Sequence, residues 1–126
     1  MMPLPELARA HFEAPRNAGR LDAATGLIGR GCAGHVQSGI EVEFQIAATS
    51  DLRLGPVAWL CLGPPEAIAA ASWLSEAVFG STPGSAAGWT APGICEALEL
   101  PAQAVSDVLV VEDAFRRALA DLERQT

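Results

Sequence analysis

The side chains best suited to metal chemistry lie close together in one short segment. Cys32 and His35 stand three residues apart in the stretch Cys32-Ala33-Gly34-His35, where the glycine favours a turn. A soft thiolate beside an imidazole suits zinc or iron. Two ligands do not complete a site, and a cysteine near a histidine in a turn also arises by chance, so a purely structural role stays open.

The other reactive side chains offer little catalytic material. His11 and His35 are the two histidines that could act as bases near neutral pH, and the sequence shows no Ser-His-Asp arrangement and no glycine-rich phosphate loop. Three cysteines cannot all pair, which indicates free thiols in a reducing compartment. We expect Cys61 and Cys95, which lie in apolar runs, to pack in the core, and His11 to pack or cap the first helix.

Composition and charge exclude several classes of protein. The 126 residues predict a single domain, 1–126, and 50% hydrophobic against 18% charged residues excludes a disordered chain. The net charge is −7, lysine is absent and the eight arginines are scattered, so the sequence predicts no nucleic-acid or anionic-membrane partner. The apolar stretch 56–74 is broken by Gly63-Pro64-Pro65 and cannot span a bilayer. Residues 1–6 lack the features of a secretion signal, so we expect a cytoplasmic protein.

Three segments are typical of β-strands, and they are expected at 26–32, 40–46 and 57–62. The middle strand alternates apolar and polar residues, which indicates a sheet with one side toward solvent. Glu41, Glu43 and Gln45 are therefore expected to be exposed. A turn at 49–51 joins the second and third strands as an antiparallel hairpin.

The remaining segments favour helices, which are expected at 6–13, 65–79, 92–98 and 103–123, with a loop at 81–88. The first helix has an apolar side made of Leu7, Ala10 and Phe12. The last carries an apolar stripe at helical spacing that consists of Val105, Val108, Leu109, Phe115, Leu119 and Leu122. This order predicts an α+β fold, a three-stranded antiparallel sheet with the helices that begin at Pro65 and Gln103 packed on one face.

Four collinear segments resemble the NifU/IscU-type iron–sulfur cluster assembly scaffolds. Residues 11–21 are similar to the family's opening, a histidine and an aromatic residue followed by a Pro-Arg-Asn-x-Gly turn. Residues 63–72 resemble its Ala-Ile-Ala-rich helix, Leu100-Pro101 its Leu-Pro motif, and 112–121 its closing helix. The resemblance runs from about residue 7 to residue 122 and implies the fold that the hydrophobic pattern also predicts.

The resemblance implies metal ligands from three segments: a cysteine before Gly-Asp, a cysteine before the Ala-Ile-Ala helix, and a His-Cys pair that starts the last helix. This sequence departs at nearly all of them: Cys32 or Ala33 stands at the first cysteine, His35 at the aspartate, Pro64 at the second cysteine, and Ser106-Asp107 at the His-Cys pair. The segment 100–104 also lacks the Val-Lys of the family's Leu-Pro-Pro-Val-Lys chaperone motif.

A metal centre would then draw on Cys32, His35, Asp107 and Cys61, and we expect Cys32, His35, Pro64 and Asp107 to meet in one shallow region at the end of the sheet. Asp107 also suits a solvated carboxylate in the first turn of a helix.

By resemblance, the protein is a scaffold rather than an enzyme, and it binds iron or an iron–sulfur cluster for transfer at an atypical or degenerate site. One alternative is a pseudo-scaffold that docks assembly partners, such as a cysteine desulfurase, and carries no cluster. Another is a domain stabilised by zinc on Cys32 and His35. The sequence leaves open the metal, whether any is bound, and the oligomeric state.

Overall fold

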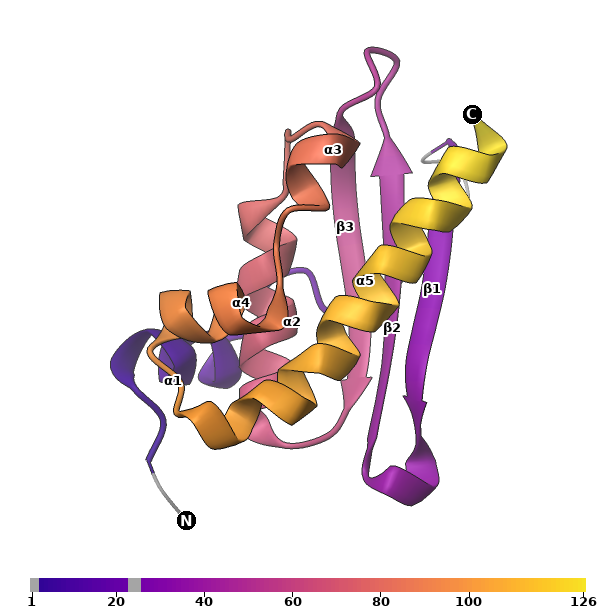
Figure 1. Cartoon of the computed structure of the whole chain (residues 1–126). Helices are drawn as coiled ribbons and strands as arrows, with labels where there is room; N and C mark the ends of the chain where they lie inside the picture. Colours follow the sequence, from indigo (N-terminus) through magenta and orange to yellow (C-terminus); the bar gives the residue numbers. More distant parts are fainter. Residues whose placement is uncertain (1–2, 23–25) are drawn as a thin grey trace.

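The computed structural model describes residues 3–22 and 26–126, so Met1 and Met2, which begin the segment examined for a secretion signal, lie outside the described residues. The fold is α+β. Its centre is a three-stranded antiparallel sheet in the order β1-β2-β3 (Figure 1). The strands are β1 (Ile28–His35), β2 (Ile40–Ala48) and β3 (Leu54–Leu62). The predicted sheet and the hairpin between its second and third strands are confirmed.

The helices are α1 (Glu6–Glu13), α2 (Pro65–Ala77), α3 (Pro83–Ala86), α4 (Ala91–Leu98) and α5 (Val105–Gln125), with single 3-10 turns η2 (Val36–Ser38) and η3 (Ala102–Ala104). The short helix α3 stands where a loop was predicted, because Thr82 caps it by accepting a hydrogen bond from the Ser85 N–H and Pro83 fits its first turn. Helices α2 and α5 lie on the same face of the sheet, as predicted, and α5 crosses it obliquely (Figure 1).

Strand β1 begins later and ends later than the sequence predicts. Its glycines weaken the local strand signal, but every residue from Ile28 to His35 has a partner on β2, and the last pair is His35 with Ile40. The stretch from Cys32 to His35 is therefore strand and not turn. This correction fixes the direction of its side chains, since neighbouring residues of a strand point to opposite faces.

Close packing of α5 on β1 depends on two glycines. A Cβ atom at Gly29 or Gly31 would collide with the backbone of Ala118, so only glycine admits the helix at this distance. Side chains of α5 also satisfy the free edge of β1: Asp121 accepts from the Arg30 N–H, and Arg117 donates to the Cys32 carbonyl. The edge strand is thereby covered by the helix.

The outer face of the sheet is less exposed than the alternation predicts. Glu41 is exposed and Glu43 half-buried, but Gln45 is only 1% exposed. The chain after α1 crosses this face, and the Leu21 N–H donates to the Gln45 side-chain oxygen at 2.7 Å while the Gln45 amide donates to Glu43. The prediction that Gln45 is exposed was wrong because it considered the strand without this crossing segment.

Two predicted helix faces also need correction. Helix α1 buries Ala8 and His11, whereas Leu7 and Phe12 remain partly exposed. On α5, Leu109 is exposed, and the buried face instead consists of Val108, Val111, Ala114, Phe115, Ala118, Leu119 and Leu122. Small alanines take part in this face because the β1 glycines bring the strand so close.

Candidate functional site

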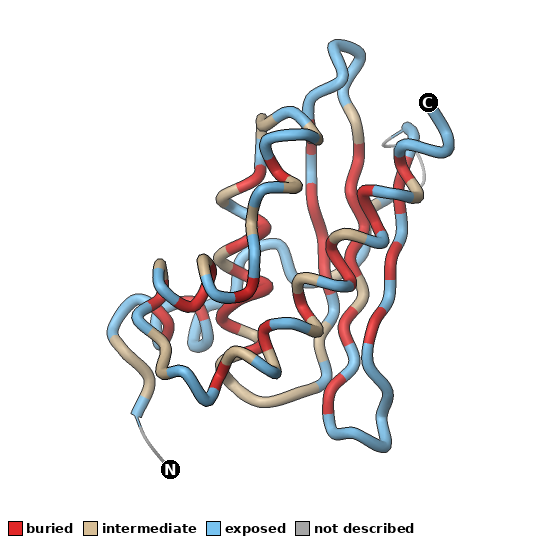
Figure 2. The backbone as a smooth tube through the Cα atoms, viewed as in Figure 1, coloured by how far each residue is buried: buried red, intermediate tan, exposed pale blue. Residues whose placement is uncertain are grey.

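Three chain segments meet at one end of the sheet, which we call the open end: residues 34–40 of the β1–β2 hairpin, the β3–α2 connection at 63–65, and the start of the last helix at 103–107 (Figure 1). A Cβ atom at Gly63 would lie 3.1 Å from Cγ1 of Ile40, and one at Gly34 would lie 3.0 Å from Cγ1 of Val110. The hairpin at this end is exposed (Figure 2). The segments that the resemblance implies as ligand carriers therefore lie at the same end of the sheet.

The two cysteines expected at a metal centre point to opposite faces of the sheet. Cys32 pairs across the strands with Glu43, and Cys61 pairs with Val42. Val42 faces the core and Glu43 the outer side, and cross-strand partners share a face. Cys32 thus lies on the outer face, whereas the residue that faces the helices next to it is Ala33, which is 5% exposed.

His35 and Asp107 lie at the open end without forming a ligand group. The His35 side chain is exposed, and its backbone N–H faces the Ser38 hydroxyl. Asp107 is half-buried in the first turn of α5, the position that the helix dipole favours for a carboxylate. Within residues 3–22 and 26–126, no three His, Cys, Asp or Glu side chains are grouped closely enough to hold one metal ion.

The local environment raises the pKa of both Cys32 and Cys61. Desolvation raises the pKa of Cys32, and the negative charges of Glu43 and Glu41 raise it further against the opposing effect of Arg117 and Arg20. Burial raises the pKa of Cys61 to about 11. Both shifts favour the neutral thiol over the thiolate, which is the form that binds metals.

Cys95 and His11 have the structural positions predicted for them. Cys95 is buried in α4. His11 is 3% exposed and belongs to what we call the polar junction, a set of paired side chains between α1, the following turn and α2: His11, Arg16, Asn17, Ser72 and Ser75.

Hydrogen bonds of the polar junction explain the histidine's orientation. Nδ1 of His11 lies 2.8 Å from Oγ of Ser72 and 3.3 Å from Nη1 of Arg16. Because an arginine can only donate, Nδ1 must accept, which leaves the proton on Nε2, 3.7 Å from Oε1 of Glu76. The Ser72 hydroxyl then donates to His11 and accepts from the Arg16 N–H at 2.8 Å.

The same junction holds the turn after α1 against β3. The Trp59 indole N–H donates to the Arg16 carbonyl at 2.7 Å, and the Asn17 amide donates to Ser75 at 3.0 Å. Asn17 has a φ of 65°, a left-handed conformation that asparagine tolerates better than most residues. The Pro-Arg-Asn-x-Gly turn of this chain therefore has a structural role.

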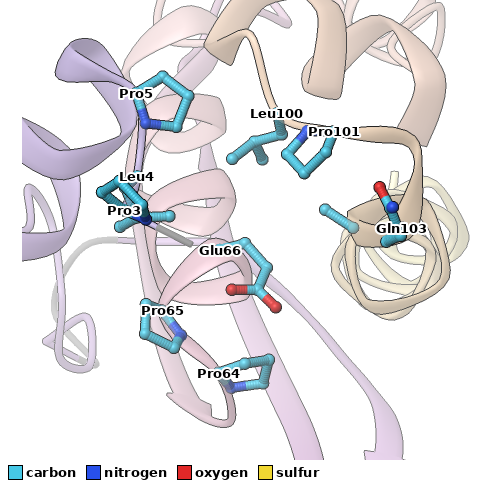
Figure 3. Close-up of a pocket in the computed structure, with 10 residues that line it drawn as sticks. Pro3, Leu4, Pro5, Pro64, Pro65, Glu66, Leu100, Pro101 and Gln103 are labelled. Atoms are coloured by element: carbon cyan, nitrogen blue, oxygen red, sulfur yellow. The ribbon is translucent and has the colours of Figure 1, made fainter. Parts of the chain in front are cut away.

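A pocket of about 320 Å³ lies beside Pro64 at the open end (Figure 3). It is formed by residues 3–5, the start of α2 and residues 100–104, and its walls are mostly apolar. The carboxylate of Glu66 extends into it. In the sequence, Glu66 is one residue of the helix predicted at 65–79, and nothing marks it as part of a pocket. The five prolines of the pocket come from three separate chain segments, so they indicate a pocket only after the chain has folded.

Residues 6–126 match the NifU-like N terminal domain model. The chain is 32% identical over 111 residues to the Haemophilus influenzae iron–sulfur cluster assembly scaffold protein IscU, and this alignment covers 88% of each chain. It is 31% identical to IscU of Escherichia coli K12, covering 88% of this chain and 87% of that protein.

Solved structures show the same fold at low sequence identity. A putative iron–sulfur cluster assembly scaffold protein for the SUF system of Fervidobacterium islandicum superposes with a TM-score of 0.53 at 13% identity, covering 94% of this chain and 93% of that one. A hypothetical protein superposes with a TM-score of 0.69, covering 90% of this chain and 94% of that one. The chain belongs to the NifU-like N terminal domain family, in which the curated relatives are named as assembly scaffolds.

The donors of the open end do not fit an iron–sulfur cluster. Ala33 and Pro64 have no side-chain donor, and Asp107 offers a hard oxygen where soft sulfur is preferred. Cys32 lies on the outer face, and Cys61 is partly buried on the opposite one. These side chains therefore do not form a set of ligands for an iron–sulfur cluster.

Proposed function

We propose that this protein acts in iron–sulfur cluster assembly as a scaffold-fold docking module that binds assembly partners without carrying a cluster on three thiolates. The observation that supports this most is a fully formed fold in which Ala33, and not Cys32, faces the helices, together with Pro64 and Asp107 at two positions that the resemblance implies as ligands. Its role is non-catalytic and cytoplasmic. In the described part of the chain, no helix is long and apolar enough to cross a membrane.

The partner with the strongest claim is a cysteine desulfurase. Docking requires a rigid surface, and the polar junction and the packing of α5 on β1 supply rigid support for the open end. A partner that normally delivers sulfur to a scaffold would find the shape here without the acceptor thiolates. Such a complex would be unproductive for cluster formation and would compete with a cluster-building scaffold.

A second candidate is a weak metal carrier that uses Cys32, His35, Asp107 and Cys61. One observation favours it: Cys32 and His35 are both exposed and belong to the same strand. Four ligands would require Cys61 to leave the core side of β3, because its partner Val42 faces the core. In the structure as it stands, iron or zinc would have Cys32 and His35 as its exposed ligands, and zinc would serve as a structural ion.

The test is a competition assay with the cysteine desulfurase from the organism in which this protein occurs. Cluster formation on Escherichia coli IscU is followed by visible absorption under anaerobic conditions, with and without a tenfold excess of this protein. The proposal expects a stable complex with the desulfurase in gel filtration and slower cluster formation on IscU. If the protein neither binds the desulfurase nor slows the reaction at that excess, the docking function is wrong.

A further inference from the structure

The pocket beside Pro64 is lined by side chains that change shape very little. Five of its residues are prolines: Pro3, Pro5, Pro64, Pro65 and Pro101. A proline ring fixes its own backbone angle, so these walls are preorganised and lose little conformational entropy when something binds. The volume of about 320 Å³ lies at the small end of the range for ligand sites, enough for one or two side chains.

Two polar side chains, Glu66 and Gln103, belong to the lining of this apolar cavity. Figure 3 shows the Glu66 carboxylate between the segment at Pro3 and Leu4 and the wall that carries Gln103. Neither the Glu66 carboxylate nor the Gln103 amide has a hydrogen-bond or ion-pair partner among the described residues. The positive end of α2 stabilises the charge of Glu66 in this position, and its oxygens remain available to a ligand.

We propose that this pocket docks an extended segment of a partner protein that carries one arginine or lysine between apolar residues. The cation pairs with Glu66, the apolar neighbours pack on the proline walls and Leu100, and Gln103 bonds to the backbone of the segment. The charge of the whole chain supports this occupant, because a net charge of −7 steers cationic segments toward it. The inference rests on the docking function proposed above and adds the chemistry of the partner.

The position of the pocket connects it to the loss of a ligand. Pro64, which stands where the resemblance implies a cysteine, forms part of the pocket wall. The residue that cannot bind metal thus contributes an apolar surface at the same place. A partner segment in the pocket would lie beside the open end.

The experiment is a fluorescence-anisotropy titration of the full chain with two labelled pentapeptides, Leu-Pro-Arg-Leu-Ala and the same peptide with citrulline in place of arginine. Citrulline has nearly the same shape as arginine and no charge. We expect the arginine peptide to bind at least fivefold more tightly. Glu66→Gln should weaken the arginine peptide about five- to tenfold and leave the citrulline peptide unchanged.

The matched control is Glu96→Gln, which removes the same charge from an exposed position on α4 and should change neither affinity by more than about twofold. Gln103→Trp should fill the cavity from its exposed wall and abolish binding of both peptides. Amide NMR shifts of the unmodified protein at Glu66, Leu100 and Gln103 on adding the arginine peptide locate the contact without any substitution.

Equal affinity for the two peptides, equal effects of the Glu66 and Glu96 substitutions, or NMR shifts confined to the outer face of the sheet would overturn the inference. So would a dimer of the protein that Gln103→Trp dissociates, since the occupant would then be a second copy of the chain. The titration contains no assembly protein. A failure here beside a positive desulfurase competition would therefore remove the pocket's role and leave the docking function intact.

Discussion

The polar junction and the open end make opposite use of the segments that resemble the scaffold family. At the polar junction, His11 and Arg16 come from the first segment that resembles the family and Ser72 from the second, and all three are hydrogen-bonded. At the open end, the positions implied as ligands hold Pro64 and Ser106-Asp107, and no metal-ligating group of three forms within the described residues. The segments that resemble the family thus hold the fold together at the polar junction, whereas the open end has no ligand group of three among the described residues.

The largest contrast in stability is expected between Ser72→Ala and Ser106→Ala. Ser72 is fully buried and bonds to both His11 and the Arg16 N–H, so its removal takes a partner from each, leaves the Arg16 N–H without its partner, and costs about 2 kcal/mol of unfolding free energy, roughly thirtyfold in the folding equilibrium. Ser106 is exposed, and its substitution should cost less than about 0.5 kcal/mol. Urea denaturation followed by circular dichroism measures both. Equal losses would erase the distinction between the two regions.

Restoring thiols should turn the open end into a metal site. The triple variant Ala33→Cys, Pro64→Cys, Asp107→Cys places sulfur on the three segments that converge there, and it should hold about one zinc per chain, roughly ten times the content of the unmodified protein. Metal analysis after dialysis gives the ratio. The control is the triple variant with Cys32→Ser added, which should bind equally well because Cys32 faces away. A large loss in that control would place Cys32 in the site after all.

Thiol labelling separates Cys32 from the two other cysteines. A maleimide at pH 7.5 should label Cys32, which is exposed, and spare Cys61 and Cys95 until the protein is unfolded. Because Glu43 raises the pKa of Cys32, Glu43→Gln should speed labelling several-fold by increasing the thiolate fraction. Glu96→Gln should leave the rate unchanged. Prompt labelling of Cys61 in the native protein would show that β3 opens readily and would favour the metal-carrier hypothesis.

The smallest expected effect is a pH dependence that originates at His11. Burial lowers the pKa of His11, and Arg16 lowers it further against the opposing charge of Glu76. The unfolded chain therefore takes up a proton before the folded one does, so stability is full above about pH 6.5 and declines as pH falls toward the lowered pKa. The decline between pH 7.5 and 5 should be smaller in His11→Asn and unchanged in His35→Asn. Identical slopes in both variants would show that His11 does not contribute.

The elements could be predicted from the sequence wherever a short pattern determines them. The alternation in β2 and the proline at the start of α2 gave both elements correctly. Gln45 shows what such a pattern misses, because its burial depends on a segment that crosses the sheet from 24 residues earlier in the chain. Leu109 shows the same for α5, because a stripe at helical spacing did not distinguish Leu109, which is exposed, from its neighbour Val108, which is buried.

The ligand set was harder to predict because it depends on register. A shift of one residue along a strand moves a side chain to the other face, and the sequence left open whether Cys32 or Ala33 occupies the ligand position. Pairing of Cys32 with Glu43 answers the question of direction: the thiol faces outward. The binding of metal by Cys32, His35, Asp107 and Cys61 stays a prediction. The pocket at Glu66 could not be seen at all without the fold.

The most direct test of the central claim is the iron and labile-sulfide content of the protein after anaerobic incubation with cysteine desulfurase, ferrous iron and cysteine. The docking function predicts less than about 0.1 iron and 0.1 sulfide per chain after desalting, with the same low values in Cys32→Ser. Escherichia coli IscU treated in parallel shows that the reaction mixture is competent. Iron and sulfide in equal amounts near one or two per chain, lost in the Cys32→Ser variant, would contradict the account and identify a cluster-carrying scaffold.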